Sequence, residues 1–436
     1  MADGIAIVGA GYAGLAAAVE LAGRGVACEI FEASRTLGGR ARAVEIDGLT
    51  LDNGAHILVG AYAETLRLMR QVEAPADALK RQPLHLEFPG RFRLRAPALP
   101  APLHLAAALA GARGLSWREK FATLRFMQGL KARRFRLPAD ITVAELLAQQ
   151  PDRPRRFLWE PLCLAALNTP PAEASAQVFA HVLRDSLAAG RAASDLLLPA
   201  TDFSALFPEP AARWLAARGT VIHRGTRIGS IGMTMADDGE RYFLDGRGPY
   251  RQVIVAVAPQ HAAALLGVLP RLTLLREQLA ALRWQPIVTC YLRYPPHVRL
   301  PVPMAGVEGG YAQWLFDRGA LCGQHGVIGA VISGPGRHDG LDAGALATRI
   351  DAEVRRIVPG LPEPAWHRVI AEKRATFACT PGLSRPWVET PLPGLLLAGD
   401  YIDGDYPATI EGAVRSGVAA ALSAHGRIGQ PAGHQP

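Results

Sequence analysis

The first residues that could carry chemistry form a glycine-rich turn near the start of the sequence. Gly9, Gly11 and Gly14 lie in the run GAGYAG, which follows a short apolar segment at 5–8. The first glycine permits a tight turn, the second lets the backbone approach a pyrophosphate, and the third lets a helix pack against the strand. The N–H groups that begin this helix face the phosphate charge. Glu32 stands eighteen residues after Gly14, where its carboxylate can accept hydrogen bonds from ribose hydroxyls.

Further motifs stand close to this turn and near the other end of the sequence. The run LGGRA occupies 37–41 and DNGAH occupies 52–56, while LLLAGD at 395–400 precedes PATIEGA at 407–413. With these motifs in this order, the sequence resembles the family of phytoene desaturases, protoporphyrinogen oxidases and flavin amine oxidases. The resemblance extends over nearly the whole chain. It implies an FAD-dependent oxidoreductase that binds its FAD non-covalently.

The same resemblance assigns residues to the cofactor. The glycine–arginine segment would lie along the pyrophosphate and the flavin edge, and Asp400 would hold the ribitol or pyrophosphate region. A helix that begins near Ala408 would direct its N-terminus at the flavin N1/C2 carbonyl, where it stabilises the negative charge of reduced flavin. The expected cofactor-binding residues are Gly9, Gly11, Tyr12, Ala13, Gly14, Glu32, Ala33, Gly39, Arg40, Asn53, Gly54, Ala55, His56, Arg227, Ala258, Gly399, Asp400, Ala408, Thr409 and Ile410.

The middle of the sequence narrows the resemblance to the squalene-associated branch of this family. The runs at 159–170 and 193–199 carry it, together with TPG at 380–382. That branch implies reduction of hydroxysqualene to squalene in hopanoid biosynthesis, with hydride from reduced flavin replacing an allylic hydroxyl of a long isoprenoid lipid. An external electron donor must then recharge the flavin.

Loss of the hydroxyl as water needs an acid. The candidate catalytic residues are Asp195, Glu160 and Asp403, with His56 as a proton relay.

Two alternatives stay open on the sequence. A carotenoid-type desaturase or a flavin amine oxidase would use the same scaffold in the opposite direction and take hydride from its substrate. A non-catalytic prenyl-lipid-binding protein would share the fold without needing FAD, although the intact Gly39-Arg40 and Gly399-Asp400 pairs argue against it.

Composition limits the class of partner. The 47 basic residues exceed the 39 acidic ones by eight, a surplus that suits nucleic acid, an anionic membrane or an acidic ligand. We expect no nucleic acid and no metal, because the sequence has neither an aromatic-interleaved basic run nor zinc-ligand spacing. Five dispersed cysteines favour a reducing, cytoplasmic location, and no apolar run is long enough to span a bilayer.

One predicted helix, at 116–137, bears on membrane contact. Residues 116–119 (SWRE) have the form of a capping box, and apolar residues then recur at helical spacing: Trp117, Phe121, Leu124 and Met127. Basic side chains accompany them, namely Arg118, Lys120, Arg125, Lys131, Arg133, Arg134 and Arg136. An interfacial helix on anionic lipid and a solvated helix over the substrate domain both fit this pattern. A membrane-dissolved substrate favours lipid, and therefore a peripheral position on the inner face of the cell membrane.

The order of elements predicts an α/β fold. Strands are expected at 5–8, 26–32, 221–222, 253–257, 287–291 and 326–332, and a strand, loop and helix at 394–421. We therefore expect a Rossmann-type FAD-binding domain assembled from the discontinuous segments 1–61, 215–260 and 388–425. A mixed α+β substrate domain would comprise a helical, membrane-facing insertion at 62–214 and a mixed sheet at 261–387, with 426–436 as a flexible tail.

Overall fold

The computed structural model describes residues 4–54, 56–237, 239–267, 269 and 271–427. Its first sheet has five parallel strands in the order β10-β2-β1-β14-β20. They are β1 (Ile5–Val8), β2 (Cys28–Glu32), β10 (Val221–Arg224), β14 (Gln252–Val255) and β20 (Leu395–Leu397). Each of the three sequence segments expected to build the FAD-binding domain contributes at least one of these strands, and all the expected strands in those segments are present.

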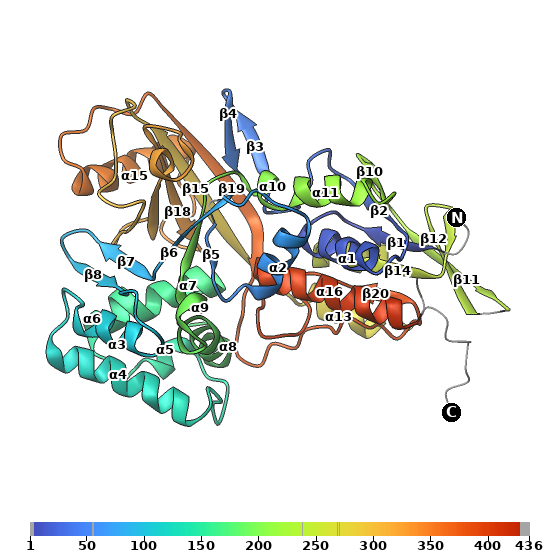
Figure 1. Ribbon diagram of the computed structural model, residues 1–436, viewed down its shortest axis with the longest axis horizontal. Coiled ribbons are helices and arrows are strands. Elements are labelled where there is room, and N and C mark those ends of the chain that lie inside the picture. The colour runs from blue at the N-terminus through green and yellow to red at the C-terminus, as the bar shows by residue number, and fades with distance from the viewer. Residues whose placement is uncertain (1–3, 55, 238, 268, 270, 428–436) are drawn as a thin grey trace.

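Helices and a small sheet cover the two faces of the parallel sheet. Side chains of β1 alternate between them, so that Ile5 and Ile7 enter one core and Ala6 and Val8 enter the other. The first face packs on α1 (Tyr12–Gly23), α2 (Ala63–Gln71), α11 (Pro208–Ala216) and α16 (Ile410–Gly426). Figure 1 shows α1 and α16 side by side over the sheet. The second face packs on β11 (Ile231–Ala236), β12 (Gly239–Leu244), β13 (Arg247–Tyr250), α12 (Pro259–Leu265) and α13 (Thr273–Ala280).

The expected boundaries of the helical insertion are corrected by this packing. Helices α2 and α10 (Phe203–Leu206) and most of α11 lie within 62–214, yet they pack around α1 and α16 rather than with the insertion. Leu68 of α2 and Ala211 of α11 are fully buried in the same core as α1. An amphipathic helix shows in its sequence that one side is buried, but it does not show which partner buries it.

The remaining part of the insertion mixes helices with short strands. Its strands are β6 (Leu79–Gln82), β7 (His85–Phe88), β8 (Phe92–Arg95) and β9 (Leu196–Pro199). Strands β7 and β8 form a hairpin, and β9 pairs with β6 and with β5 (Leu58–Val59), which precedes the insertion, in the sheet β5-β9-β6. Its helices are α3 (Leu103–Ala110), α4 (Trp117–Ala132), α5 (Val143–Leu146), α6 (Asp152–Pro154), α7 (Glu160–Leu167), α8 (Ala176–Leu183) and α9 (Arg191–Ser194). Two π-helical turns, η1 (Arg155–Trp159) and η2 (Arg184–Ala188), join some of these helices.

An antiparallel sheet completes the molecule, with the order β16-β17-β18-β15-β19. Its strands are β15 (Trp284–Arg293), β16 (Met304–Gly306), β17 (Trp314–Asp317), β18 (Val327–Ser333) and β19 (Trp366–Phe377). Helix α15 (Ala343–Ile357) packs on it, and α14 (Arg318–Cys322) follows β17. The hairpin β3 (Ala43–Ile46) and β4 (Leu49–Asp52) projects beside this sheet in Figure 1. Strand β19 runs from this sheet towards the parallel one, so its last residues reach the site described below.

Candidate active site

A cavity of about 1210 Å³ lies where the parallel sheet, the insertion and the antiparallel sheet meet. It is larger than the ~300–1,000 Å³ typical of a site for one small ligand. One half of its wall is made by the glycine-rich turn, the end of β2 and the start of α16. The other half is made by α7, α8, β9 and the antiparallel sheet. The cavity therefore has room for a dinucleotide and a second molecule.

Glycine is required at several points in the first half. Gly9 has φ +106°, and a Cβ there would lie 2.6 Å from the carbonyl oxygen of Ala256. A Cβ on Gly14 would lie 1.9 Å from the carbonyl oxygen of Gly9. The turn also contacts the second glycine motif, because Gly38 donates a hydrogen bond to the carbonyl of Ala10 at 2.9 Å. Two glycine-containing backbone segments thus form a continuous floor that a pyrophosphate can approach.

Glu32 is held at the edge of this floor. Its carboxylate accepts hydrogen bonds from the backbone N–H groups of Ala10 and Ser34, both at 2.7 Å. A carboxylate offers roughly four acceptor positions, so Glu32 keeps capacity for the hydroxyl groups of a ribose. The position of its carboxylate is fixed by the turn that would hold the neighbouring phosphate.

Arg40 and Asp400 join the N-terminal and C-terminal motifs. Nη2 of Arg40 donates to Oδ1 of Asp400 at 2.6 Å, and Nη1 donates to the carbonyl of Ala375 in β19 at 2.6 Å. Asp400 is buried. Through these two contacts, Arg40 connects the second glycine motif, β19 and the C-terminal motif, which are distant from one another in the sequence.

Helix α16 begins at the cavity and directs its N-terminus into it. Thr409 is the N-cap residue, and its side chain accepts from the N–H of Gly412 at 3.0 Å. Close packing on α1 sets the direction of this helix, because a Cβ on Gly417 would lie 2.1 Å from the carbonyl of Ala13. The positive ends of two helices, α1 and α16, thus face one cavity, which favours a ligand with negative charge at both places.

Most of the residues expected to bind the cofactor line the cavity. They are Gly9, Gly11, Tyr12, Ala13, Glu32, Ala33, Gly39, Arg40, His56, Arg227, Ala258, Gly399, Asp400, Ala408, Thr409 and Ile410. Gly14, Asn53 and Gly54 do not belong to the wall. Gly14 packs α1 on the turn, and Asn53 donates to the carbonyl of Arg40 and to Glu372, both at 3.2 Å. Ala55 lies outside the described residues.

The second half of the wall is largely apolar. Its side chains come from α7, α8, β7, β9 and the antiparallel sheet: Leu86, Leu162, Ala165, Ala166, Val178, Val182, Leu196, Ile287, Met304, Trp314, Phe316 and Val331. Such a surface suits a hydrocarbon, because each buried CH₂ group gains about 0.8 kcal/mol. Trp159 and Phe157 precede α7 in the sequence, but both are buried in the core of the insertion and lie outside the wall.

Three of the four candidate catalytic residues lie outside the cavity wall. Asp195 is buried and pairs with Arg81 at 3.0 Å. Glu160 and Asp403 are partly exposed and pair with Arg155 and Arg385, both at 3.1 Å. These carboxylates stabilise local structure and do not reach a molecule in the cavity. The sequence suggested them because it shows acids close to motifs, but not the direction of their side chains.

His56 does line the cavity, but as a neutral imidazole. Burial lowers the pKa of His56 below its ordinary value. Its Nδ1 contacts the carbonyl oxygen of Gly54, which can only accept, so Nδ1 carries the proton. The ring is therefore suited to accept a proton at Nε2 rather than to donate one.

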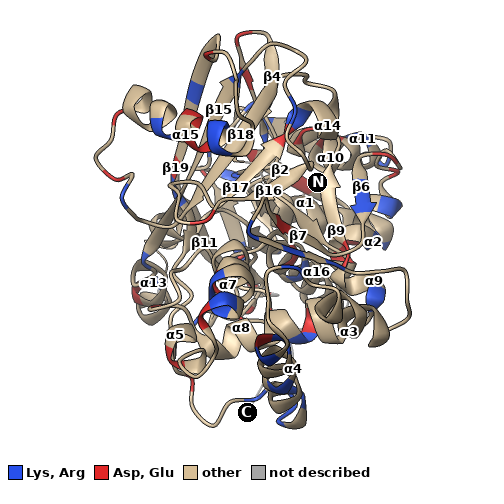
Figure 2. Ribbon diagram, turned by 90° about the vertical axis from the view of Figure 1, so that its left-hand side faces the viewer, with Lys and Arg blue, Asp and Glu red and all other residues tan. Residues whose placement is uncertain are grey.

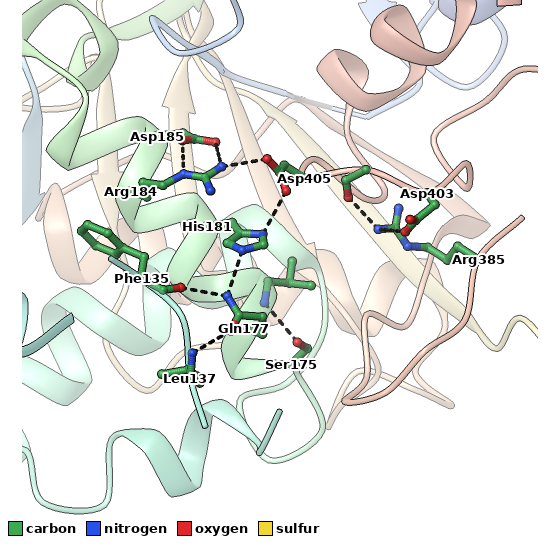
Figure 3. A network of polar contacts seen from close by, with 12 residues as sticks. Phe135, Leu137, Ser175, Gln177, His181, Arg184, Asp185, Arg385, Asp403 and Asp405 are labelled. Carbon is green, nitrogen blue, oxygen red and sulfur yellow. Dashed lines mark hydrogen bonds and ion pairs between the residues drawn. The ribbon is translucent and has the colours of Figure 1, made fainter. Parts of the chain in front are cut away.

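A polar cluster that was not predicted lies on the insertion side of the cavity. Asp185, Asp405 and Tyr406 belong to the wall, and Figure 3 shows Asp185 and Asp405 joined through Arg184, with His181 in contact with Asp405. No sequence motif marks this cluster. It combines the π-helical turn η2 with the loop before α16, which are far apart in the chain.

Comparison with known proteins identifies the family to which this chain belongs. Residues 12–423 match the model for flavin-containing amine oxidoreductases. The chain belongs to this family and is an FAD-dependent oxidoreductase. Cyclohexylamine oxidase from Brevibacterium oxydans has the same fold, with a TM-score of 0.71 at 17% identity over 99% of this chain and 100% of that one.

Two relatives narrow the similarity within the family. The chain is 33% identical to the hydroxysqualene dehydroxylase of Rhodopseudomonas palustris, over 97% of this chain and 98% of the relative. It is 29% identical to the enzyme of the same name from Sinorhizobium fredii, over the same shares of the two chains.

The wall fits FAD on structural grounds. Two glycine segments accommodate a pyrophosphate, Glu32 is placed for a ribose, and the N-terminus of α16 faces the other half of the cavity. When bound, FAD supplies the hydride chemistry. The chain itself orients the ligands, excludes water with the apolar wall, and fixes the Arg40–Asp400 pair. In the part of the chain that the structure describes, no three His, Cys, Asp or Glu residues gather as metal ligands would.

Proposed function

We propose that this enzyme reduces hydroxysqualene to squalene. The observation that carries the proposal is a large apolar chamber next to the dinucleotide site, in a chain that matches hydroxysqualene dehydroxylases along almost its whole length. In the reaction the allylic C–O bond breaks, a C–H bond forms from hydride, and one proton taken up from solvent converts the departing hydroxyl to water. An external electron donor, which we also propose, returns two electrons to the cofactor.

The division of the cavity supports this substrate. A long isoprenoid gains binding energy from the apolar wall, while the reacting carbon must lie beside the dinucleotide half. Of the described carboxylates in the wall, Glu32 and Asp400 are engaged on the dinucleotide side. The apolar wall also restricts water, which protects an allylic cation from recapture.

The direct test is a single turnover. The purified protein is photoreduced without oxygen and mixed with hydroxysqualene in detergent, and the flavin spectrum is followed before the lipids are extracted. We expect reoxidation of the flavin together with one squalene per flavin. A flavin that stays reduced contradicts the proposal. The oxidised protein is the matched control, since it cannot donate hydride; bleaching of its flavin by a polyene or an amine would instead support a desaturase or amine oxidase.

We further propose that the enzyme works at the cytoplasmic face of the cell membrane and docks on anionic lipid through α4. No helix in the described residues is both long and apolar enough to cross a bilayer. Helix α4 begins with the expected capping box of Ser116 and Glu119. Its outer stripe is formed by Trp117, Phe121 and Leu124, whose exposed fractions are 73%, 67% and 40%.

This stripe is separate from the buried face of α4. At about 100° per residue, Trp117, Phe121 and Leu124 share one side, while the buried Thr123 and Leu130 lie on another. Basic residues flank the stripe, and Figure 2 shows them along α4 at the lower edge of the molecule. Glu119 is the sole acidic residue of this helix, and its carboxylate is engaged by Ser116. An apolar stripe between basic margins suits an anionic bilayer surface.

Vesicle sedimentation tests this docking. The protein is expected to sediment with vesicles that contain phosphatidylglycerol and to bind phosphatidylcholine vesicles much less. A double substitution of Trp117 and Phe121 by Ala is expected to reduce binding about tenfold or more, because each buried aromatic side chain contributes roughly 1.5–3 kcal/mol. Trp387→Ala is the control, because Trp387 is 71% exposed but lies outside α4. Equal loss in the control, or none in the double variant, contradicts the role of α4.

A further inference from the structure

The apolar wall of the cavity contains one charged interruption on the insertion side. Val178, Val182 and Asp185 line the cavity at positions i, i+4 and i+7, so they occupy one face of α8 and η2. Two turns of this face present hydrocarbon and the third presents a carboxylate. The carboxylate lies on a π-helical turn, a local irregularity that is frequent at functional sites.

The surroundings of Asp185 hold its carboxylate in one orientation. Nε of Arg184 donates to Oδ1 at 2.6 Å and Nη2 donates to Oδ2 at 2.9 Å. The hydroxyl of Tyr406, in the loop before α16, also donates to Asp185. Burial by itself would raise the pKa of Asp185, but the hydrogen bonds from Arg184 and Tyr406 outweigh it and keep the pKa below its ordinary value. Asp185 is therefore a carboxylate anion and a hydrogen-bond acceptor, not an acid.

A second set of contacts holds Arg184. Its Nη2 also donates to Oδ2 of Asp405 at 2.8 Å, and Asp405 contacts Nδ1 of His181 at 3.2 Å. The other ring nitrogen of His181 accepts from the amide of Gln177 at 2.8 Å, so Nδ1 carries the proton that His181 donates to Asp405. Figure 3 shows this chain of contacts running from Gln177 to Asp185. It ties the insertion to the loop before α16 and fixes the direction of Asp185.

The carboxylate retains capacity for one more partner. A carboxylate has roughly four acceptor positions, and the contacts recorded among the described residues use three. A hydrocarbon placed against this group would cover the remaining position without replacing its water, which costs free energy. A hydroxyl group on the same chain would donate into it.

We propose that Asp185 recognises the hydroxyl group of the isoprenoid and thereby selects the hydroxylated substrate over the hydrocarbon product. The inference rests on the proposed function and adds the residue that determines its specificity. Because the product lacks the hydroxyl, the same contact that holds the substrate is lost after reaction, and squalene is released more readily than hydroxysqualene. Asp185 also places a negative charge where positive charge develops as the C–O bond breaks.

The test measures binding to the oxidised holoenzyme, in which no turnover occurs. Hydroxysqualene and squalene are titrated in detergent, and the change in the flavin spectrum gives each Kd. We expect the wild-type protein to prefer hydroxysqualene by about 10- to 100-fold, the ratio that a hydrogen bond to a charged group provides. Asp185→Leu is expected to abolish the preference and Asp185→Asn to reduce it, with the FAD content of both unchanged. A preference that survives in Asp185→Leu overturns the assignment.

Asp351→Asn is the matched control, since Asp351 also accepts hydrogen bonds from an arginine and a tyrosine, Arg355 and Tyr294, both at 2.6 Å, but lies outside the cavity wall. Its preference for hydroxysqualene is expected to stay within about threefold of the wild type. Loss of preference in Asp351→Asn as large as that in Asp185→Asn would show that the effect is not specific to Asp185 and overturn the proposal.

A substrate-side change keeps the proposal testable if the variants do not fold. The methyl ether of hydroxysqualene keeps the oxygen and adds little volume, but it cannot donate a hydrogen bond. Wild-type protein is expected to bind the ether about as weakly as squalene, and ether binding as tight as that of the alcohol would overturn the proposal. The photoreduced wild type separates the two conclusions. If the photoreduced enzyme converts hydroxysqualene but binds the ether as tightly as the alcohol, only the role of Asp185 is contradicted. If the photoreduced enzyme does not convert hydroxysqualene, the proposed function is contradicted, and the role of Asp185 with it.

Discussion

The two halves of the cavity differ in which part of the chain forms the wall, backbone in one half and side chains in the other. The dinucleotide half consists mainly of backbone, with Gly9 and Gly39 in conformations of positive φ and the N-termini of α1 and α16 directed inwards. The isoprenoid half consists mainly of apolar side chains from α7, α8 and the antiparallel sheet, and its polar members include the cluster around Asp185 and the β19 residues Glu372 and Lys373. Backbone recognition tolerates almost no change of residue, whereas a hydrocarbon wall tolerates many changes of equal volume. Substitutions in the first half should therefore act on the cofactor, and those in the second should act on the lipid.

The largest effect is expected for Gly14→Ala. The new Cβ would lie 1.9 Å from the carbonyl of Gly9, so the turn must move and its phosphate floor is lost. We expect protein with little or no bound FAD, measured by flavin absorbance per chain. Gly129→Ala in α4 is the control, because its Cβ meets nothing within 4 Å, and it should be neutral or slightly stabilising. Gly14→Ala protein with a full complement of FAD would falsify the backbone account.

Asp400→Ala is expected to have the next largest effect. Loss of this carboxylate leaves Arg40 without its ionic partner and removes the expected cofactor contact. A charged hydrogen bond of about 1.5–3 kcal/mol corresponds to roughly a 10- to 150-fold weaker Kd for FAD, measured by titrating the apoprotein. Asp152→Ala is the comparison, since it removes an exposed ion pair with Arg155 far from the cofactor wall. Similar affinities in both variants contradict the role of Asp400.

Ala166→Phe tests the other half of the cavity. The added ring occupies part of the apolar chamber, so we expect KM for hydroxysqualene to rise about tenfold while the FAD content stays normal, because larger side chains cost about 1–3 kcal/mol where space is limited. Ala352→Phe, on the exposed side of α15, should leave both quantities unchanged. If Ala166→Phe lowers FAD content instead, the two halves are not independent.

The smallest effect is expected from the titration of His56. Burial lowers its pKa, so below pH ~6.5 the unfolded chain binds a proton that the folded protein does not. Stability should therefore fall as the pH decreases from about 7 to about 5, and His56→Gln should reduce this slope. Thermal unfolding of both proteins across this range measures the difference. Parallel curves would show that His56 has the same pKa in both states.

The sequence was sufficient to predict the backbone half because its parts are contiguous. The run at 5–8, its glycine turn and Glu32 lie within one short segment, and a buried parallel strand appears as a short apolar run. The segments LGGRA and LLLAGD were recognised by resemblance, and the structure confirms that they meet through Arg40 and Asp400. The individual assignments to FAD stay predictions.

The lipid half could not be predicted in the same way. Asp185 follows Arg184 directly, which in a sequence looks like an ordinary pair on a helix surface. Its role depends on Tyr406, which only tertiary packing brings near. Asp195 seemed a better acid because it stands beside a motif, yet its side chain turns to Arg81. The packing of α2 on α16 and of α11 on α1 could not be predicted either, because an amphipathic helix does not show in its sequence which element covers its apolar side.

The close crossing of α1 and α16 at Gly417 has a consequence for biosynthesis. The glycine turn leaves the ribosome early, but β20 and α16, which complete the sheet edge and the opposite wall, emerge almost four hundred residues later. A nascent chain therefore carries an incomplete nucleotide site and an uncovered apolar face on α1 for most of its synthesis, and such surfaces are prone to aggregation. Cofactor capture must wait for the last helix. The supply of FAD at that moment then helps to decide whether a new chain matures or is degraded.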